Sequence, residues 1–420
     1  MGVGTSTVAQ SPKAQEALPP LKLEDLQLSP LSYFGPLRAL LTELHDYKKH
    51  PNRKLFYDGY VSLLLLCYFN PVIRGLRQIQ QFSSFAKIQK ELGVTRASLA
   101  SLSEASHVFD PKPLAHIFER LAAQVCAKDT PALPEGVPEA MQLIAVDGTL
   151  LDALSRMLWA VWLEKYENAA KVHLHFNVSR GVPVVFELTE GNGDERKSLQ
   201  EHLAADCLYL IDRGYVDYKL YQEINTAGSS FVGRLRSNAA MEVITSRPLT
   251  EKDRAAGIES DQEVWLGGVK ENTRIPRPVR VLKVHVKNPP ARNLKPKVAK
   301  VNGKVKLIRS HEEEFDAWLV TDRLDLPADV VVLLYRYRWH VETFFRWFKC
   351  VLGCRHLFAE SPQGLTIQIY VALIAGLLIV LWTGCKPTRY ALSATTFYFG
   401  GIATWEELRR ELDRLKPARA

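Results

Sequence analysis

The sequence is short of the features that mark secreted, zinc-binding and membrane-spanning proteins. Its six cysteines are scattered, mostly within apolar segments, and show no paired framework, which is typical of a reducing compartment. Cys350 and Cys354 lie one helical turn apart, but no second Cys/His pair with zinc spacing accompanies them, so we expect core thiols. The N-terminus has no basic start followed by an apolar run, which argues against a secretion signal.

Long apolar runs are also scarce. The strongest spans residues 369–381 and reaches roughly 17 residues when extended to Cys385, which is the short limit for a membrane span. We therefore predict a buried helix here and no membrane association. Internal repeats and a glycine-rich nucleotide-binding loop are absent from the sequence as well.

What the chain does carry is a local excess of positive charge. Its 420 residues are 47% hydrophobic and 24% charged, enough for two or three domains or for one domain with insertions. The formal net charge is +8, yet residues 270–309 hold eight Lys and five Arg against Glu271 alone, a net +12 that leaves −4 for the remainder. This concentration favours an acidic partner, either nucleic acid or an anionic membrane surface.

Helical patterns dominate the first third of the chain. Residues 1–20 are rich in Pro, Ala, Ser and Gln and are predicted to be disordered. Residues 21–135 are predicted to form an all-α domain. Within it, residues 74–105 resemble a helix, a glycine-containing turn and a second helix, an arrangement that can seat in a DNA groove. Such pairs are also common in plain helical bundles, so DNA contact by this region stays open.

Two aspartates follow short apolar strands in residues 136–237. Asp147 ends the run MQLIAVD, and Asp212 ends the run CLYLID. A carboxylate at the carboxyl end of a buried strand is a usual site position in an α/β sheet. Asp-Gly and Asp-Arg-Gly also favour turns, so a purely structural role stays open for each aspartate taken alone.

Residues 238–316 are predicted to form a basic, β-rich insertion. Several of its segments alternate polar and apolar residues, and VNGK at residues 301–304 is a hairpin signal. Lys300, Lys304 and Lys306 flank this turn, as expected for a ribbon lying against phosphates. The alternative is an edge hairpin that its lysines protect from aggregation.

A long helix is predicted over residues 326–353, with Pro327 near its start and Gly353 at its end. One stripe at helical spacing is apolar and should be buried. This stripe consists of Tyr337, Val341, Phe344, Phe345, Phe348, Val351 and Leu352. A second stripe sets Glu342 among Tyr335, Arg338, Arg346 and Lys349. The alternative for this stripe is a solvated face on which Glu342 pairs with two of the arginines.

The three carboxylates Asp147, Asp212 and Glu342 together suit a site for two divalent cations, because hard oxygen ligands hold Mg²⁺ or Mn²⁺. Two such ions can activate an attacking hydroxyl group and stabilise the leaving oxygen, which is the chemistry of phosphoryl transfer. The cations and the phenol of the second stripe are donors suited to a phosphodiester backbone.

The chain resembles bacterial DDE transposases of insertion-sequence family four, which carry a Y-(2)-R-(3)-E-(6)-K signature. This signature is matched at every offset by Tyr335, Arg338, Glu342 and Lys349. The segments VDGT around Asp147, IDRGY around Asp212 and FVGRL extend the match. The resemblance covers residues 140 to 380, approximately.

The resemblance implies an RNase H-like α/β fold, a mixed sheet interrupted by the β-rich insertion before the glutamate helix. Residues 136–237 and 317–385 would form the two parts of this core, and residues 386–420 a C-terminal helical tail. The two aspartates and the glutamate would be the catalytic residues, binding two Mg²⁺ ions, or Mn²⁺, in each active site. The Tyr, Arg and Lys of the signature would handle the transposon end.

Further DNA contacts are also implied. Arg346 lies on the same predicted face as the signature residues. Some relatives flip a base and make a DNA hairpin, and Trp339 and Trp265 are candidates for stacking on such a base, although we expect either ring to be buried.

These expectations combine into a predicted DNA transposase. It would bind the inverted ends of its own element as a homodimer or transient assembly, hydrolyse the phosphodiester bonds at these ends and transfer the 3′ ends to double-stranded target DNA. It would be cytoplasmic and nucleoid-associated in a bacterium, with the N-terminal helices recognising the ends. The alternative is a non-catalytic DNA-binding protein descended from a transposase, against which the three intact carboxylates argue.

Overall fold

The computed structural model describes residues 41–47, 52–70, 73, 75–152, 157, 159–160, 169–268, 274–287, 297–301, 304–308, 314–352 and 358–414. Residues 1–20, predicted to be disordered, lie outside these ranges.

Apart from a helical stretch at residues 41–45, the helices of the first half are α2 (Tyr57–Phe69), α3 (Leu76–Phe82), α4 (Ala86–Leu92), α5 (Leu99–Val108), α6 (Lys112–Gln124), α7 (Glu195–Glu201), a 3₁₀ turn η3 (Arg213–Tyr215) and α8 (Tyr218–Thr226). Those of the second half are α9 (Glu251–Ala255), α10 (Ala328–Tyr337), α11 (Trp339–Leu352), α12 (Pro362–Thr383), α13 (Arg389–Phe399) and α14 (Trp405–Asp413).

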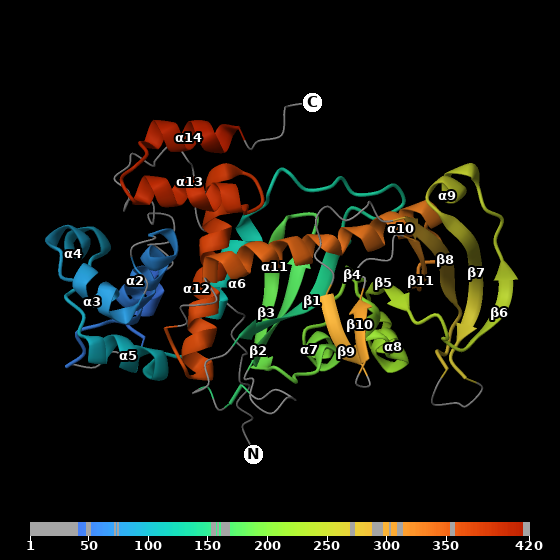
Figure 1. The fold of residues 1–420 in the computed structure, drawn as a ribbon, viewed down its shortest axis with the longest axis horizontal. Coiled ribbons are helices and arrows are strands. Elements are labelled where there is room, and N and C mark those ends of the chain that lie inside the picture. Colours follow the sequence, from blue (N-terminus) through green and yellow to red (C-terminus); the bar gives the residue numbers. More distant parts are fainter. Residues whose placement is uncertain are drawn as a thin grey trace, which may run out of the picture.

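Strands make up the middle of the chain. They are β1 (Gln142–Asp152), β2 (Ala169–Asn177), β3 (Val182–Glu190), β4 (Cys207–Leu210), β5 (Ser230–Leu235), β6 (Met241–Ser246), β7 (Ile258–Leu266), β8 (Val279–Lys287), β9 (Lys297–Val301), β10 (Lys304–Ile308) and β11 (Glu314–Thr321). Nine of them form one sheet in the order β3-β2-β1-β4-β5-β11-β8-β7-β6, shown from one side in Figure 1. Strands β6, β7 and β8 of the insertion therefore continue the core sheet.

The first five strands have the RNase H-like order. β1, β2 and β3 form an antiparallel meander, whereas β4 pairs parallel with β1 and β5 pairs parallel with β4. β11 then joins β5 in the antiparallel sense. The prediction of an RNase H-like mixed sheet with helices before and after it is confirmed.

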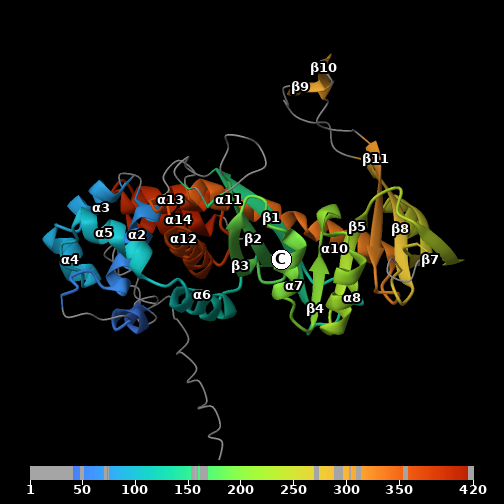
Figure 2. The ribbon, with the colours of Figure 1, turned by 90° about the horizontal axis from the view of Figure 1, so that it is seen from below.

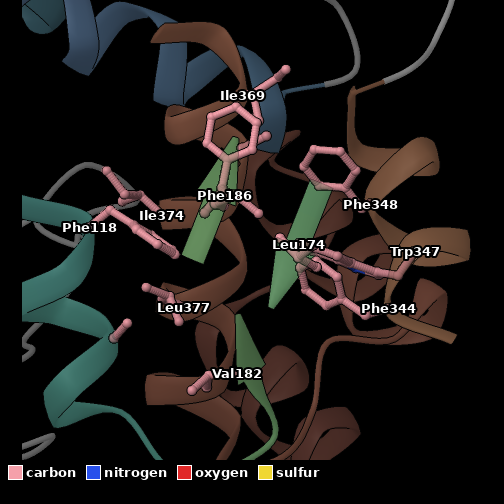
Figure 3. Packing of buried hydrophobic residues seen from close by; sticks show 14 of the residues in the cluster. Phe118, Leu174, Val182, Phe186, Phe344, Trp347, Phe348, Ile369, Ile374 and Leu377 are labelled. Carbon is pink, nitrogen blue, oxygen red and sulfur yellow. The ribbon is translucent and has the colours of Figure 1, made fainter. Parts of the chain in front are cut away.

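Helices cover both faces of this sheet. On one face α7 and α8 pack with their apolar residues against β1, β4 and β5, where Leu199, Leu220 and Phe231 are buried in one cluster. On the other face α10 and α11 cross β1, β2, β4 and β5. Figure 3 shows Phe344 and Phe348 of this second layer gathered beside Leu174 of β2.

The apolar helix α12 is a core element. It is long and apolar enough to cross a membrane, but most of it is buried inside the protein against α2, α5, α6, α11 and β3. In Figure 1 it stands between the N-terminal helices and the sheet. The prediction of a buried helix is confirmed, and the two aromatic pairs that Tyr370 makes with Phe118 and Phe186 illustrate its packing.

The helix predicted over residues 326–353 is divided in two. α10 ends at Tyr337 and α11 begins at Trp339, so Arg338 forms a one-residue break that keeps right-handed backbone angles. Tyr337 is half-buried, and Trp347, which we did not assign to the apolar stripe, is buried against Gly376 of α12. Val351 and Leu352 belong to α11, but their side chains lie outside the described part, as does Gly353.

The cysteines are less uniform than predicted. Cys67, Cys207 and Cys385 are buried, but Cys126 and Cys350 are exposed, so the expectation of a core thiol was wrong for Cys350. The side of α11 that carries Cys350 faces away from the sheet. Cys354 lies outside the described residues.

The predicted hairpin forms a separate two-stranded ribbon. β9 pairs antiparallel with β10, with Lys304 opposite Val301 and Lys306 opposite Ala299. Figure 2 shows this ribbon apart from the nine-stranded sheet. The turn residues 302 and 303 lie outside the described part of the chain.

Candidate active site

Asp147 lies where β1 separates from β4. The two strands pair only from Gln142 to Ala145, whereas β1 continues alongside β2 as far as Asp152. The prediction that Asp147 ends its strand was therefore wrong, because antiparallel pairing with β2 extends β1 beyond it. The pairing of β1 with β4 ends just before Asp147, so the sheet is open beside the Asp147 carboxylate.

Asp212 lies at the end of β4, as predicted. It follows Ile211 and caps the 3₁₀ turn η3, where its Oδ1 accepts a hydrogen bond from the backbone N–H of Gly214 at 2.5 Å. Because β1 and β4 are parallel neighbours, their adjacent ends bring Asp147 and Asp212 to the same edge of the sheet. The charge of Asp212 accordingly acts on the carboxyl group of Asp147.

Arg338 connects the first aspartate to the glutamate. Glu342 lies on the first turn of α11, and its Oε1 accepts from Arg338 Nη2 at 2.5 Å. Arg338 Nη1 lies 3.5 Å from Oδ2 of Asp147. The guanidinium thus lies between the two carboxylates and is only 8% exposed. The ion pair between Glu342 and Arg338, which the sequence left as the alternative, is present, whereas Arg346 donates instead to Thr343.

The environment of Asp147 shifts its protonation. Burial, assisted by the charges of Asp212 and Glu342 and opposed by Arg338 and the backbone N–H of Gly148, raises the pKa of Asp147 to about 7. A carboxyl group is ordinarily ionised well below this value. Like charges close together have this effect on a buried acid, which is consistent with three carboxylates gathered at one centre.

The other signature residues surround this centre on α10 and α11. Tyr335 is half-buried, and the Arg338 guanidinium lies 5.9 Å from its ring centroid. Lys349 is half-buried two turns beyond Glu342, and Arg346 is exposed. Their contacts with DNA stay a prediction, and so does that of Arg338, which in this structure is engaged with carboxylates.

The two tryptophans are more accessible than expected. Trp339 is 57% exposed and its ring centroid lies 5.9 Å from the Arg338 guanidinium, so the expectation of burial was wrong for it. Trp265 is half-buried in β7 and lies under the guanidinium of Arg274 at 4.8 Å. Trp339 is the first residue of α11, and the break at Arg338 turns it outward.

Acidic residues of the insertion and of the adjoining core partly neutralise the basic insertion. Arg274 pairs with Glu242, and Arg277 pairs with Asp322. Lys283 contacts two further carboxylates. The lysines predicted to contact DNA lie on the ribbon, Lys300 on β9 and Lys304 and Lys306 on β10, and their role stays a prediction.

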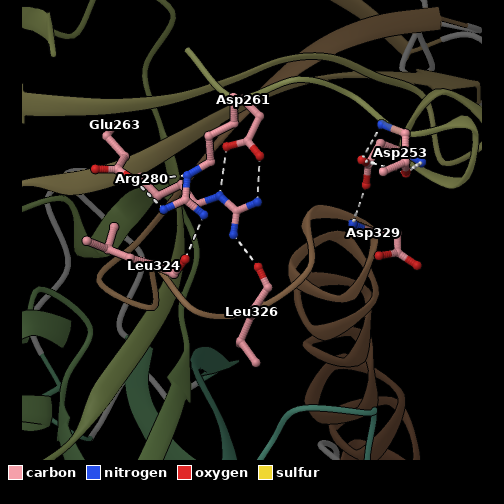
Figure 4. A network of polar contacts seen from close by, with 9 residues as sticks. Asp253, Asp261, Glu263, Arg280, Leu324, Leu326 and Asp329 are labelled. Atoms are coloured by element: carbon pink, nitrogen blue, oxygen red, sulfur yellow. Dashed lines mark hydrogen bonds and ion pairs between the residues drawn. The ribbon is translucent and has the colours of Figure 1, made fainter. Parts of the chain in front are cut away.

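Three sets of polar contacts, one buried and two partly buried, hold the start of α10 against the insertion (Figure 4). Arg280 of β8 makes two hydrogen bonds to Asp261 of β7 and a third to the carbonyl of Leu326. Arg247 similarly joins Glu263 to the carbonyl of Leu324. In addition, Asp253 accepts from the backbone N–H of Asp329 in the first turn of α10 at 3.2 Å.

These contacts have a consequence for the site. They tie the loop that leads into α10 to three elements of the insertion, so the β-rich segment orients the helix that presents Arg338 and, after it, Glu342. Buried arginine and carboxylate groups in this geometry satisfy each other's hydrogen bonds.

Sequence reasoning missed three residues of this centre. Glu195 begins α7 and lies close to the backbone of Gly148 and Gly214, Lys171 of β2 lies 3.4 Å from it, and Tyr215 is buried nearby. The sequence predicts no site role for Glu195. The signal was its position after an N-capping aspartate in GDERK, at the start of the helix that follows the β-meander.

A second acidic group lies far along the sheet from this centre. Glu259, His285 and Asp316 have ligand atoms that all lie within 4.8 Å of one another. Lys283 Nζ already lies 2.6 Å from Glu259 and 3.0 Å from Asp316. We interpret this group as a surface ion-pair network, because the lysine supplies its positive charge.

Comparisons with known proteins agree with this geometry. The family model described as "Transposase DDE domain" matches residues 138–378. A putative transposase, y4zB, of Sinorhizobium fredii is 25% identical over 212 residues, which cover 50% of this chain and 52% of that protein. A putative transposase for the insertion sequence element IS4SA of Synechocystis is 19% identical over 255 residues, covering 57% and 60%. The chain thus spans about half to three-fifths of these relatives.

Among solved structures, the piggyBac transposase synaptic complex with hairpin DNA is a distant likeness. Its TM-score is 0.42 at 11% identity, over 93% of this chain and 86% of that one.

An RNase H-like sheet that gathers two aspartates and a helical glutamate defines the class of protein. Within that class, this chain belongs to the DDE transposase family, since the family model covers more than half of it. The prediction of the family is thereby confirmed.

Proposed function

We propose that this protein cleaves the DNA ends of an insertion sequence and transfers the 3′ ends to target DNA. It would act on double-stranded DNA, as a homodimer in the active complex, within the bacterial cytoplasm. The observation that carries the proposal is that the Arg338 guanidinium contacts both Asp147 and Glu342, while the charge of Asp212 acts on the carboxyl group of Asp147. Family membership supports the reaction class, and the half-length overlap with the relatives leaves substrates and partners to be tested.

The donor set fits divalent cations. Asp147, Asp212 and Glu342 offer only carboxylate oxygens, the ligands that Mg²⁺ and Mn²⁺ prefer, and the Arg338 guanidinium shows that the position between two of them accepts positive charge. Two ions bound there would supply activation of the attacking hydroxyl and stabilisation of the leaving oxygen.

The residues around the carboxylates would position the DNA. Tyr335 lies on α10, and Arg346 and Lys349 lie on α11 together with Glu342. A phosphodiester bound by these three donors would therefore be aligned with the carboxylates. Arg338 would exchange a carboxylate for a phosphate oxygen when DNA and cations are present. Exposed Trp339 is suited to stack on an unpaired base.

The proposal is tested by cleavage of duplexes that carry the terminal repeats flanking the coding region. We expect Mg²⁺-dependent strand cleavage by the wild type, and its loss in Asp147→Ala, Asp212→Ala and Glu342→Ala with DNA binding largely retained. A gel-shift assay run in parallel measures binding. Full cleavage by the Glu342→Ala protein would overturn the site assignment.

The same assays distinguish residues that bind DNA from residues that catalyse strand cleavage. Lys349→Ala should weaken binding of the cleaved end and lessen its dependence on salt, because one phosphate contact would be lost. Lys197→Ala, on an exposed helix face elsewhere, is the matched control. Wild-type protein that binds the ends without cutting them under any divalent cation would instead identify a non-catalytic DNA-binding protein.

A further inference from the structure

Glu195 approaches the catalytic centre from the opposite face of the sheet. Asp147 points to the face of the sheet that α11 covers. Gly148, the next residue along β1, points to the face that α7 covers, where Glu195 is the first residue of the helix. Because the pairing of β1 with β4 has already ended at Ala145, no neighbouring strand separates the two sides here.

The Glu195 carboxylate lies beside two glycines. A Cβ atom on Gly148 would lie 2.8 Å from Glu195 Oε1, so a larger residue there would require the Glu195 side chain to shift. A Cβ atom on Gly214 would lie 3.0 Å from Asp212 Oδ1 and 3.4 Å from Glu195 Oε2. The two carboxylates thus lie on either side of one small space, and any larger residue at Gly214 would enter it.

A buried hydroxyl group points to a ligand at the same place. Tyr215 is fully buried and its Oη has no hydrogen-bond partner among the described residues. Burial raises the pKa of Tyr215 well above its usual value, and the charge of Glu195, followed by those of Asp147 and Asp212, raises it further. A buried hydroxyl group without a protein partner is ordinarily satisfied by water or by a bound group.

We propose that Glu195 is a fourth carboxylate of the catalytic centre and a ligand, together with Asp212, of one of its divalent cations. This inference rests on the proposed function, because it adds a residue to the same metal centre. Four carboxylates would offset the charge of two divalent cations more completely than three. Tyr215 would then donate to the oxygens that surround the ion.

A purely structural role for Glu195 predicts a different outcome. Its Oε1 lies 3.4 Å from Lys171 Nζ, and Lys171 also donates to the carbonyl of Gly193 at 3.0 Å. If Glu195 served only to neutralise Lys171, removing the charge of either residue would change the stability of the protein by a similar amount. Neither change would affect cation binding. The two interpretations therefore differ in cation affinity.

The test is Mn²⁺ binding to the full-length protein, measured by titration calorimetry without DNA, with thermal unfolding in EDTA as the measure of stability. We expect Glu195→Gln to weaken Mn²⁺ binding about tenfold or more, Glu195→Asp to weaken it less, and strand cleavage to fall with it. Lys171→Gln should leave the affinity unchanged or raise it. Glu201→Gln, on the exposed end of the same helix, should match the wild type.

The outcomes separate this inference from the function on which it rests. Wild-type affinity in Glu195→Gln, alongside loss of binding in Asp212→Asn, would overturn the role of Glu195 and leave the three-carboxylate centre standing. A wild-type protein that neither binds Mn²⁺ nor cleaves DNA would overturn both. A lowered Tm in EDTA with unchanged Mn²⁺ affinity would assign Glu195 to structure alone.

Discussion

The burial of Asp147 lowers the stability of the protein at neutral pH. The pKa of Asp147 is raised to about 7 from an ordinary value of 3.8, mainly by burial. The folded state therefore holds a proton that the unfolded state has lost between these two values. Stability falls as pH rises from 4 to 7, because ionising the buried group opposes folding. Active sites commonly carry such a cost.

Asp147→Asn should therefore stabilise the metal-free protein at high pH. We expect a higher free energy of unfolding at pH 8 in EDTA, by at most about 4 kcal/mol, and a gain of less than about 1 kcal/mol at pH 4, where the folded group is protonated and the unfolded group is only partly ionised. Urea denaturation at both pH values measures this. An equal effect at pH 4 and pH 8 would show that ionisation of Asp147 is not its cause. Glu201→Gln provides the exposed control.

The insertion and α10 depend on each other at the scale of elements. The buried pair of Arg280 and Asp261 lies on two strands of the insertion, yet Arg280 also donates to the carbonyl of Leu326 at the entry to α10. The position of Glu342 thus depends on a contact about 60 residues earlier in the chain. The basic stretch of residues 270–309, which predicted contact with DNA, thus includes Arg280, which stabilises the fold.

Arg280→Ala should destabilise the protein strongly. We expect a loss of about 3–5 kcal/mol in the free energy of unfolding, because Asp261 would stay buried without its partner. Urea denaturation followed by circular dichroism measures the loss. Lys197→Ala removes an exposed pair with Glu201 and should change stability by less than about 1 kcal/mol. A small effect of Arg280→Ala would mean that water reaches Asp261 and replaces the arginine.

The N-terminal helices and the catalytic core share one hydrophobic cluster at the scale of the whole molecule. α12 follows the glutamate helix in sequence, but its apolar surface is covered by α2, α5 and α6 from the start of the chain. Figure 1 shows this arrangement, with the N-terminal helices against α12 and the sheet on its other side. The division at residue 135 stays a prediction, and this shared cluster argues that the two parts fold together.

Removing residues 1–124 should therefore yield an aggregating fragment. Loss of α2 to α6 would expose the apolar face of α12, and large exposed apolar patches drive association. Size-exclusion chromatography of the expressed fragment measures this. Removing residues 1–20 alone, which are predicted to be disordered, is the control and should leave a well-behaved protein. A monodisperse fragment from residue 125 onward would establish an independent catalytic domain.

Several parts of the candidate site can be predicted from local sequence patterns. Asp212 at a strand end, Glu342 on an amphipathic helix and the buried helix α12 follow from local spacing and apolar periodicity, which act over a few residues. The signature offsets identified the family for the same reason.

The relative positions of these parts depend on contacts between segments that are distant in sequence. The break at Arg338, the pairing of that residue with two carboxylates and the continuation of β1 past Asp147 depend on strands and helices distant in sequence. Glu195 reaches the centre through space left by Gly148 and Gly214, and contacts between residues so far apart leave no periodic trace in the chain.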